Sequence, residues 1–164
     1  MVKKDPAKGR SASGGKIEIL KKFTQELLDQ LGQPVTFGVE EKKEVININL
    51  QTDNPGIFIG YHGQTLASIQ LILSMMVYRK LGEWVKLVVD VGDYRLRRAE
   101  ALGRIALSAA QKVKFSGQEY ELPSMSSAER REIHLALAEN PEVETESTGE
   151  GRDRRVVVKP RKTG

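Results

Sequence analysis

A Gly-x-x-Gly loop, Gly60-Tyr61-His62-Gly63, is the stretch whose residue types favour binding chemistry most directly. Two glycines three residues apart remove side chains at two positions, so another molecule can approach the backbone closely. A helix beginning at Gln64 would point its free amides and the positive end of its dipole toward the loop, which favours phosphate. The loop therefore predicts a phosphate contact over Gly60, Tyr61, His62, Gly63 and Gln64. A tight turn without a ligand is the plainer alternative.

A second pattern pairs Arg130 with His134, four residues apart. Ser126-Ser127-Ala128-Glu129 immediately before them is typical of a capping box, so both side chains should share one face of a helix. A cation beside an imidazole suits a phosphate contact and stacking on an unpaired base. The alternative is an ordinary surface ion pair and a histidine whose hydrogen bonds are already satisfied.

Other basic residues could converge on this second pattern. We expect Arg95 and Arg98 from a long helix and Arg155 from a C-terminal hairpin to join the site, and a wider set comprises Arg131, Arg152, Arg154 and Lys159. The alternative is a solvated face, since residues 92–164 hold 14 basic and 12 acidic residues. Four of the acids are grouped on one strand and turn of the hairpin, namely Glu142, Glu144, Glu146 and Glu150. That grouping favours convergence of the cations elsewhere.

Composition argues against several other kinds of site. The chain has no cysteine and two histidines, so we expect no disulfide, no metal site and no cofactor. No Gly-x-Ser-x-Gly elbow, Walker loop or catalytic carboxylate pair is evident, and we expect no enzymatic activity. Apolar runs are too short for membrane insertion, and the basic N-terminus lacks the apolar segment of a signal peptide. These features predict a cytoplasmic protein.

The net charge of +4 resides in the first 16 residues, which carry five basic residues and one acidic residue. The rest of the chain is balanced, with 21 residues of each sign. Because residues 1–16 are rich in Lys, Gly and Ser without periodicity, we expect a disordered tail, and residues 161–164 should form a second tail. The basic tail could tether polyanions or serve only as a solubilising segment.

The first half of the chain predicts the order helix, strand, strand, short helix, glycine loop, helix and strand. Helical spacing extends from Ile17 to Leu31, and a hairpin follows between Val35 and Leu50. A helix should cover 64–81 and a third strand 84–91. This order, with the glycine loop between the two core helices, resembles a type II KH domain over residues 17–91.

The second half predicts a long helix over 93–114, a short strand over 119–122 and the capped helix to about Glu139. A hairpin should follow, with strands at 143–147 and 154–159. This arrangement around Arg130 and His134 resembles the R-three-H domain, named for that spacing, over residues 92–160. The fold class is therefore α+β, a type II KH domain followed by a small α+β R-three-H domain.

Taken together, the two halves resemble the Jag family, also called SpoIIIJ-associated proteins. The resemblance rests on three stretches and the terminal hairpin: Ile59–Leu66, Val89–Arg95 and Met125–His134, with Thr145–Pro160. It implies a bacterial, cytoplasmic RNA-binding protein linked to cell-envelope or division control, which pairs with a small KH-domain protein. Two departures stand out: many members carry an additional N-terminal domain, and the family loop usually has Lys or Arg where this chain has Tyr61 and His62.

Two functions follow as hypotheses. The first is a non-enzymatic binder of single-stranded RNA, with single-stranded DNA as a second candidate ligand, that acts in post-transcriptional regulation. The second is a protein-interaction module whose KH fold pairs with another KH protein and whose RNA affinity comes mainly from the basic tail. The absence of a Lys or Arg between Gly60 and Gly63 favours the second hypothesis.

Overall fold

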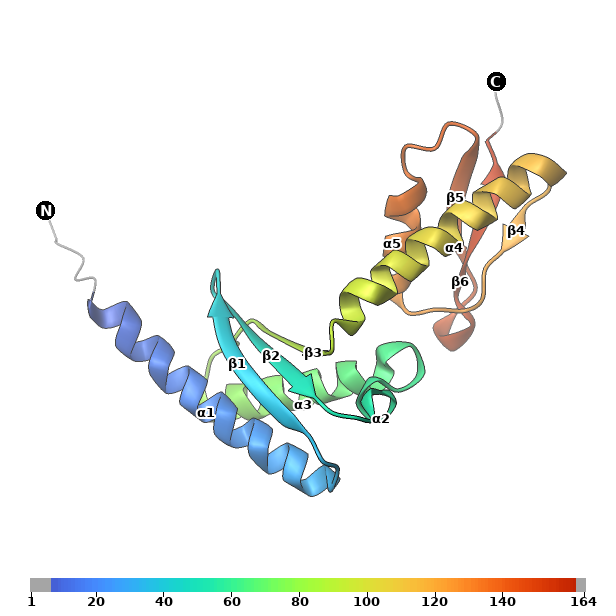
Figure 1. Ribbon diagram of the computed structural model, residues 1–164. Coiled ribbons are helices and arrows are strands. Elements are labelled where there is room, and N and C mark those ends of the chain that lie inside the picture. The colour runs from blue at the N-terminus through green and yellow to red at the C-terminus, as the bar shows by residue number, and fades with distance from the viewer. Residues whose placement is uncertain (1–6, 162–164) are drawn as a thin grey trace, which may run out of the picture. The chain divides into compact units, whose positions relative to one another are not determined.

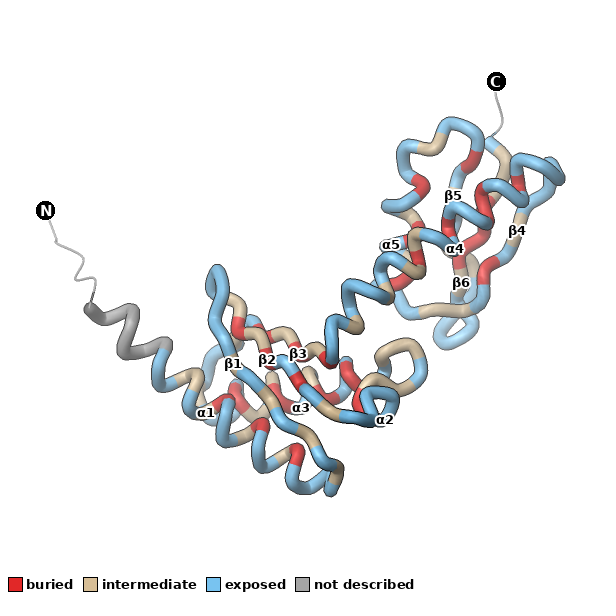
Figure 2. The backbone as a smooth tube through the Cα atoms, viewed as in Figure 1, coloured by how far each residue is buried: buried red, intermediate tan, exposed pale blue. Residues whose placement is uncertain are grey.

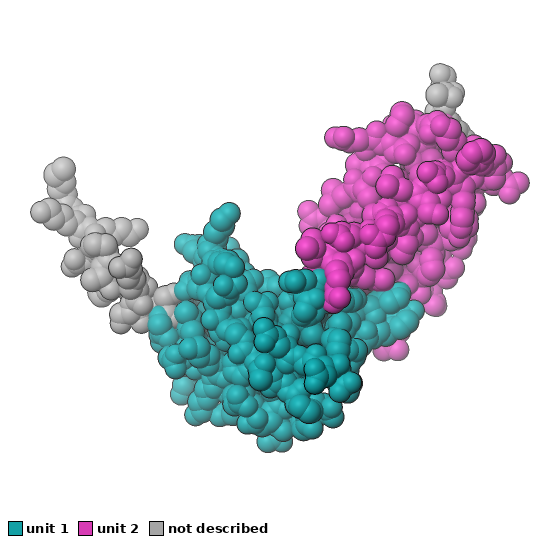
Figure 3. Space-filling model, viewed as in Figure 1, with its two compact units in different colours: residues 1–94 teal, residues 95–164 magenta. Residues whose placement is uncertain are grey.

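The computed structural model describes residues 7–161, with side chains from residue 14 onward (Figure 1). The chain forms two compact units, residues 1–94 and 95–164 (Figure 3). The boundary expected from the sequence, between residues 91 and 92, lies slightly earlier. Each unit has its own hydrophobic core, so each is described by itself.

The first helix, α1 (Ala7–Leu31), begins well before the expected start at residue 17. The prediction of disorder is therefore wrong for residues 7–16, whereas residues 1–6 and 162–164 lie outside the described part of the chain. Extending an existing helix needs no new nucleation step, which reduces the cost of adding residues of poor propensity. Lys16 also helps, since its ammonium lies 2.7 Å from the carboxylate of Glu83.

The first unit contains a three-stranded sheet in the order β1-β2-β3. Its strands are β1 (Thr36–Lys42), β2 (Val45–Gln51) and β3 (Leu87–Val91). β1 and β2 are antiparallel, whereas β2 and β3 are parallel. The crossover that parallel strands require contains α2 (Pro55–Ile59), the 3₁₀ turn η1 (Tyr61–Gly63) and α3 (Gln64–Leu81). This order confirms the predicted KH-type arrangement.

The core of the first unit lies on one face of this sheet, against α1 and α3 (Figures 1 and 2). Alternate residues of β2 point into it, so Ile48 is buried while Asn49 is exposed. Leu20 and Leu28 of α1 are buried as the helical spacing predicts, but Leu31 is 44% exposed at the helix end. Trp84 lies before β3 rather than in it, and it is exposed.

The second unit contains two longer helices and a sheet in the order β4-β6-β5, with both strand pairs antiparallel. Its helices are α4 (Tyr94–Ser116) and α5 (Ser127–Leu137), with a 3₁₀ turn η2 (Gly151–Asp153). Its strands are β4 (Tyr120–Glu121), β5 (Val143–Thr148) and β6 (Arg155–Pro160). The sequence therefore predicted every one of these longer helices and strands, with errors only at their ends. The C-terminal tail was expected from residue 161, but Arg161 donates to the Val143 carbonyl at 3.2 Å.

The core of the second unit joins α4 and α5 to one face of the sheet (Figure 2). α4 contributes Leu102, Ala106, Ala109, Ala110 and Val113, and the three alanines permit close packing. Leu96 and Ile105 also fit the apolar spacing of α4, but both side chains are exposed. No helix within residues 7–161 combines the length and apolar content that a membrane crossing needs.

Candidate nucleic-acid interface

The glycine loop has a backbone that only glycine fits at both of its ends. Gly60 has φ +68° and Gly63 has φ +82°, a region that disfavours residues with a Cβ. An added Cβ would also collide with Thr65 at Gly60 and would lie 2.9 Å from the Tyr94 ring at Gly63. The glycines therefore shape the loop as well as opening it to a ligand.

The two residues between the glycines form a stacked aromatic pair. The ring centroids of Tyr61 and His62 are 4.0 Å apart, with an angle of 10° between the planes. Tyr61 is 68% exposed, and His62 has φ +50°. The loop therefore presents a flat aromatic surface in place of the fixed cation that a Lys or Arg would supply. Such a surface suits stacking on an unpaired base.

The helix that leaves the loop has no side-chain cap at its N-terminus. Gly63 occupies the N-cap position of α3, and no side chain accepts from the first-turn amides. The amide of Gln64 bonds to the carbonyl of Tyr61, so the remaining donors of the first turn stand next to the loop. Free amides at a helix start, together with the helix dipole, are groups that favour an anion. The five residues of the predicted contact, Gly60, Tyr61, His62, Gly63 and Gln64, are all at least partly exposed.

α5 begins with the capping box that the sequence predicts. The Ser126 hydroxyl accepts from the Glu129 amide, and the Glu129 carboxylate accepts from the Ser126 amide at 2.9 Å. Glu129 is also buried against α4, where its carboxylate accepts two hydrogen bonds from Arg98 at 2.8 and 2.5 Å. Arg98 is therefore committed to a structural ion pair that fixes the start of α5, next to Arg130.

The environment of Glu129 favours its charged form. Burial by itself raises the pKa of this carboxyl, but the hydrogen bonds from the Ser126 amide and Arg98, with the charge of Arg98, outweigh burial. The net effect holds the pKa of Glu129 below its ordinary value. The carboxylate thus stays ionised and keeps both helices joined at neutral pH.

His134 is held by two hydroxyl groups of β5. Its Nδ1 lies 2.7 Å from the Thr145 Oγ1 and its Nε2 lies 2.8 Å from the Ser147 Oγ. Burial, and then the charge of Arg130, lower the pKa of His134 below its ordinary value, which favours the neutral ring. Both ring nitrogens of His134 are therefore hydrogen-bonded within the chain, as the alternative of a satisfied histidine states. His134 ties α5 to β5 and thereby positions Arg130.

Arg130 is half-buried, and among the described residues it has no carboxylate within ion-pair distance. Its guanidinium is therefore available to an external anion. Arg95, in contrast, is exposed but has an interaction within the chain. Arg98, one of the three additional arginines that the sequence suggested, forms an ion pair with Glu129 and is not free to contact a ligand.

Arg155 points to the other face of the sheet. Its neighbour in β6, Val156, faces the helices, so alternation places Arg155 away from Arg130 and His134. The predicted convergence of Arg155 with that pair is therefore wrong. Arg155 instead lies 3.1 Å from the carboxylate of Glu121 and donates to the Asp153 carbonyl.

On this outer face of the sheet a second cation, Lys159 of the wider basic set, also forms an ion pair. Lys159 lies 2.5 Å from Glu146, and this hydrogen bond lowers the pKa of Glu146 and raises that of Lys159. Val157 is buried between the two ion pairs. Of the grouped glutamates, Glu146 thus pairs with a hairpin cation across the strands, and Glu142 pairs with Lys114 of α4, which goes against the separation expected from the sequence.

Sequence reasoning missed the partners that position the site. Arg98 is 31 residues from Glu129, and no local pattern links them. Thr145 and Ser147 are two residues apart in a strand and so share a face, which was the one signal that could have linked them to a histidine. In the described part of the chain, no group of three or more His, Cys, Asp or Glu side chains could hold a metal ion.

Comparison with known proteins finds one matching family model in each of the two units. Residues 17–91 match the family model described as the KH domain of KhpA/KhpB, and residues 100–160 match that of the R-three-H domain. RNA-binding protein KhpB of Clostridium symbiosum is 36% identical over 138 residues, which cover 83% of this chain and 62% of that protein. RNA-binding protein KhpB of Lactiplantibacillus plantarum is 33% identical over 153 residues, 93% of this chain and 48% of that protein. The chain therefore spans less than two-thirds of the length of either relative.

The fold, the glycine loop and the Arg130–His134 pair define a protein with a KH domain followed by an R-three-H domain, the class of nucleic-acid-binding domains that the sequence indicated. RNA-binding protein KhpB of Bacillus subtilis is 28% identical over 144 residues, which cover 87% of this chain and 69% of that protein. In this pair of domains the chain resembles the Jag family, and the curated relatives that it matches are named RNA-binding protein KhpB.

Proposed function

We propose that this chain is a non-enzymatic, cytoplasmic protein that binds single-stranded RNA and acts as a post-transcriptional regulator linked to the cell envelope or division. The glycine loop contacts the backbone of one segment of the strand, and the Tyr61–His62 pair stacks on an unpaired base. Arg130 contacts a phosphate of another segment, while His134 holds α5 in place. Two modest contacts on one strand gain affinity through effective concentration.

The geometry of the glycine loop is the observation that carries this proposal. Positive φ angles at Gly60 and Gly63 turn the chain so that an exposed aromatic pair and the uncapped start of α3 lie together. A base and its phosphate require these two kinds of surface side by side. Because the loop has no fixed positive charge, stacking and amide hydrogen bonds must supply more of the affinity than in a loop with lysine.

The test places negative charge in the loop without changing its glycines. Tyr61→Asp/His62→Asp adds two carboxylates where phosphate should bind, and Tyr61→Asn/His62→Asn is the uncharged control of the same shape. Asp and Asn both tolerate the positive φ of residue 62. By fluorescence anisotropy with single-stranded RNA, we expect the Asp pair to weaken binding more than tenfold, about 1.4 kcal/mol, and to exceed the loss from the Asn pair.

Two further variants separate the sources of affinity. Arg130→Ala should weaken binding by up to about tenfold. Changing Lys3, Lys4, Lys8 and Arg10 to Ala removes most of the basic charge of the N-terminal segment. If RNA affinity is lost only in this last variant, the two domains are not the RNA site and the proposal is wrong.

A further proposal concerns the predicted protein partner, a small KH-domain protein. α3 carries an exposed apolar stripe on the face opposite the core, with Leu71 58%, Met75 55% and Tyr78 42% exposed. Trp84 stacks on Tyr78 with ring centroids 4.5 Å apart and extends the stripe. Because a contiguous apolar stripe on one helix is typical of a helix-pairing surface, we propose that it binds the α3-like helix of a second KH domain.

Leu71→Asp/Met75→Asp should abolish this pairing, because each carboxylate would be buried without a partner. Light scattering of the chain mixed with a small KH-domain protein should show a heterodimer for the original sequence and separate monomers for the variant. Lys80→Asp also introduces a carboxylate on α3, but nine residues from Leu71 and so on the opposite side of the helix, and it serves as the control. Heterodimers that survive Leu71→Asp/Met75→Asp would place the partner elsewhere.

A further inference from the structure

α4 concentrates positive charge, with six basic residues and one acidic residue, Glu100. Two of the cations are engaged within the unit: Arg98 with Glu129, and Lys114 with Glu142 at 2.7 Å. Arg97, Arg104 and Lys112, by contrast, have no carboxylate within ion-pair distance in the part of the chain that the structure describes. The helix therefore carries three exposed cations whose charge is available to a ligand.

Two of these cations share one line along the helix with an exposed aromatic ring. At 3.6 residues per turn, spacings of seven and eleven residues return to the same face within about 20°, so Arg97, Arg104 and Phe115 are aligned. The line spans about 27 Å of helix at 1.5 Å per residue. It points away from the core, since the buried residues of α4 lie on the opposite side of the helix. Phe115 is 92% exposed.

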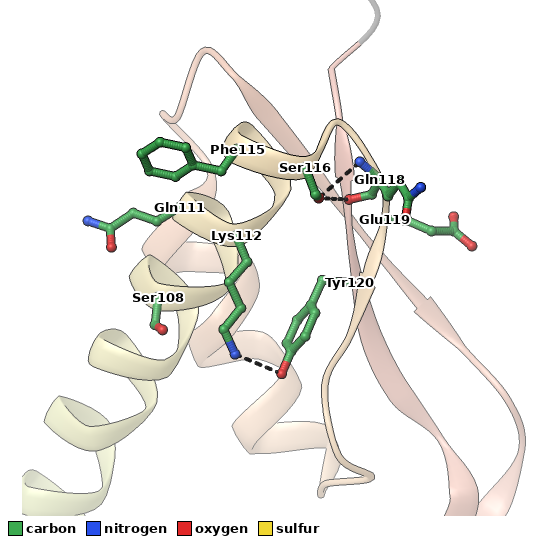
Figure 4. A pocket seen from close by; sticks show the side chains of 8 residues that line it. All are labelled: Ser108, Gln111, Lys112, Phe115, Ser116, Gln118, Glu119 and Tyr120. Atoms are coloured by element: carbon green, nitrogen blue, oxygen red, sulfur yellow. Dashed lines mark hydrogen bonds between the residues drawn. The ribbon is translucent and has the colours of Figure 1, made fainter.

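A hollow of about 650 Å³ lies beside Phe115, between the end of α4 and β4 (Figure 4). The ammonium of Lys112 lies 4.4 Å from the centre of the Tyr120 ring and donates to its hydroxyl at 3.0 Å, which fixes a cation in the hollow. Amide side chains of Gln111 and Gln118 also line it. Glu119 is the opposing charge, but it lies 4.0 Å from Lys159 and points away from Lys112 (Figure 4).

The chemistry of this surface favours a nucleic acid over a protein. The neighbours of Phe115 on this face are polar, so no contiguous apolar patch for a dry protein interface is present among the described residues that line the hollow. A single exposed ring suffices to stack on one unpaired base, and the aligned arginines suit successive phosphates. A duplex would leave the ring without a partner, because its bases are already stacked on one another.

We propose that the outer face of α4 is an additional single-stranded RNA site, with Phe115 as the base-stacking residue and Arg97, Arg104 and Lys112 as the phosphate contacts. The proposal rests on the proposed function, since it extends the path of the same ligand over the second unit. It adds a site that is separate from both the glycine loop and Arg130. The amide group of Gln111, which lies on the same side of α4 as Phe115, is placed to hydrogen-bond the edge of the stacked base (Figure 4).

A relocated tryptophan tests the site directly, because Trp84 is the chain's single tryptophan. In Trp84→Phe/Phe115→Trp the fluorophore stands at the proposed stacking position. In the control Trp84→Phe/Leu107→Trp it stands on α4 to the side of the line, where Leu107 is 54% exposed. Single-stranded RNA of about twelve nucleotides should quench the emission of the first variant and leave that of the control unchanged.

Anisotropy with the same RNA gives the energetic counterpart. Phe115→Ala should weaken binding about tenfold or more, and Leu107→Ala should not. Arg104→Ala should also weaken binding, in contrast to Lys80→Ala, which removes an equal charge from the exposed end of α3. Circular dichroism should show an unchanged fold for Phe115→Ala, because the ring is almost entirely exposed.

The outcomes separate this proposal from the function on which it rests. If the chain binds RNA but Phe115→Trp is not quenched and Phe115→Ala binds normally, the α4 site is wrong while the proposed function stands. Equal quenching by duplex RNA also overturns the single-strand assignment. If the unmodified chain does not bind RNA at all, the proposed function fails and the α4 site fails with it.

Discussion

Gly60→Ala is expected to destabilise the first unit by about 3 kcal/mol, the sum of two separate effects. The residue has φ +68°, which is strained for alanine, and its new Cβ would overlap the side chain of Thr65. Relief requires movement of the first turn of α3, since Thr65 belongs to that helix. The free energy of unfolding, measured by urea titration of Trp84 fluorescence, should fall accordingly.

Two other glycines separate these effects. Gly82 has φ +74° but open space around it, so Gly82→Ala should cost only about 1 kcal/mol through backbone strain. Gly56 has neither a positive φ nor a close neighbour, and Gly56→Ala should leave the stability nearly unchanged. If Gly60→Ala and Gly82→Ala cost the same, the collision with Thr65 contributes nothing and the loop is more adaptable than its geometry indicates.

Glu129→Ala should destabilise the second unit by roughly 3 kcal/mol, because it leaves Arg98 without its carboxylate and removes half of the capping box. Lys114→Ala breaks an exposed ion pair with Glu142 and should cost less than about 1 kcal/mol. Hydrogen exchange of α5, followed by mass spectrometry, measures the loss in this unit separately from the first. A loss no larger than that of Lys114→Ala would show that the ion pair is dispensable.

The contribution of Glu129 also depends on pH. Its pKa is lowered in the folded chain, so the unfolded chain binds its proton more readily. The stabilisation is therefore complete above the ordinary carboxyl pKa and is lost as the pH falls through the lowered value. Glu129→Gln should remove this part of the acid sensitivity, which a comparison of unfolding free energies at neutral and acidic pH will detect.

Local patterns predicted the elements of this fold well, since periodicity and capping depend on residues close in sequence. The capping box at Ser126 and Glu129 was correct for this reason. Errors arose where distant residues decide the outcome. Leu96 fits the helical spacing of α4 but is exposed, because the first turns of that helix have no core residue of their unit against them.

The candidate site shows the same division between local and distant information. The loop from Gly60 to Gly63 could be predicted, because its glycines and the following helix adjoin in sequence. The role of Arg98 could not, because its partner lies in another helix. Arg155 was placed on the wrong side because the number of intervening residues does not reveal which face of a sheet a strand residue occupies.

The paired charges around Val157 have a consequence for long-range forces. On the outer face of the β4-β6-β5 sheet, Arg155 with Glu121 and Lys159 with Glu146 cancel one another at short distance. The unpaired cations of α4 have no such counterpart within the described residues. The exposed cations of α4 therefore make the electrostatic potential around that helix more positive than the potential at the paired charges of the outer sheet face. Such an asymmetry orients a polyanion during diffusion, so that approaching strands are steered to the helical side before any contact forms.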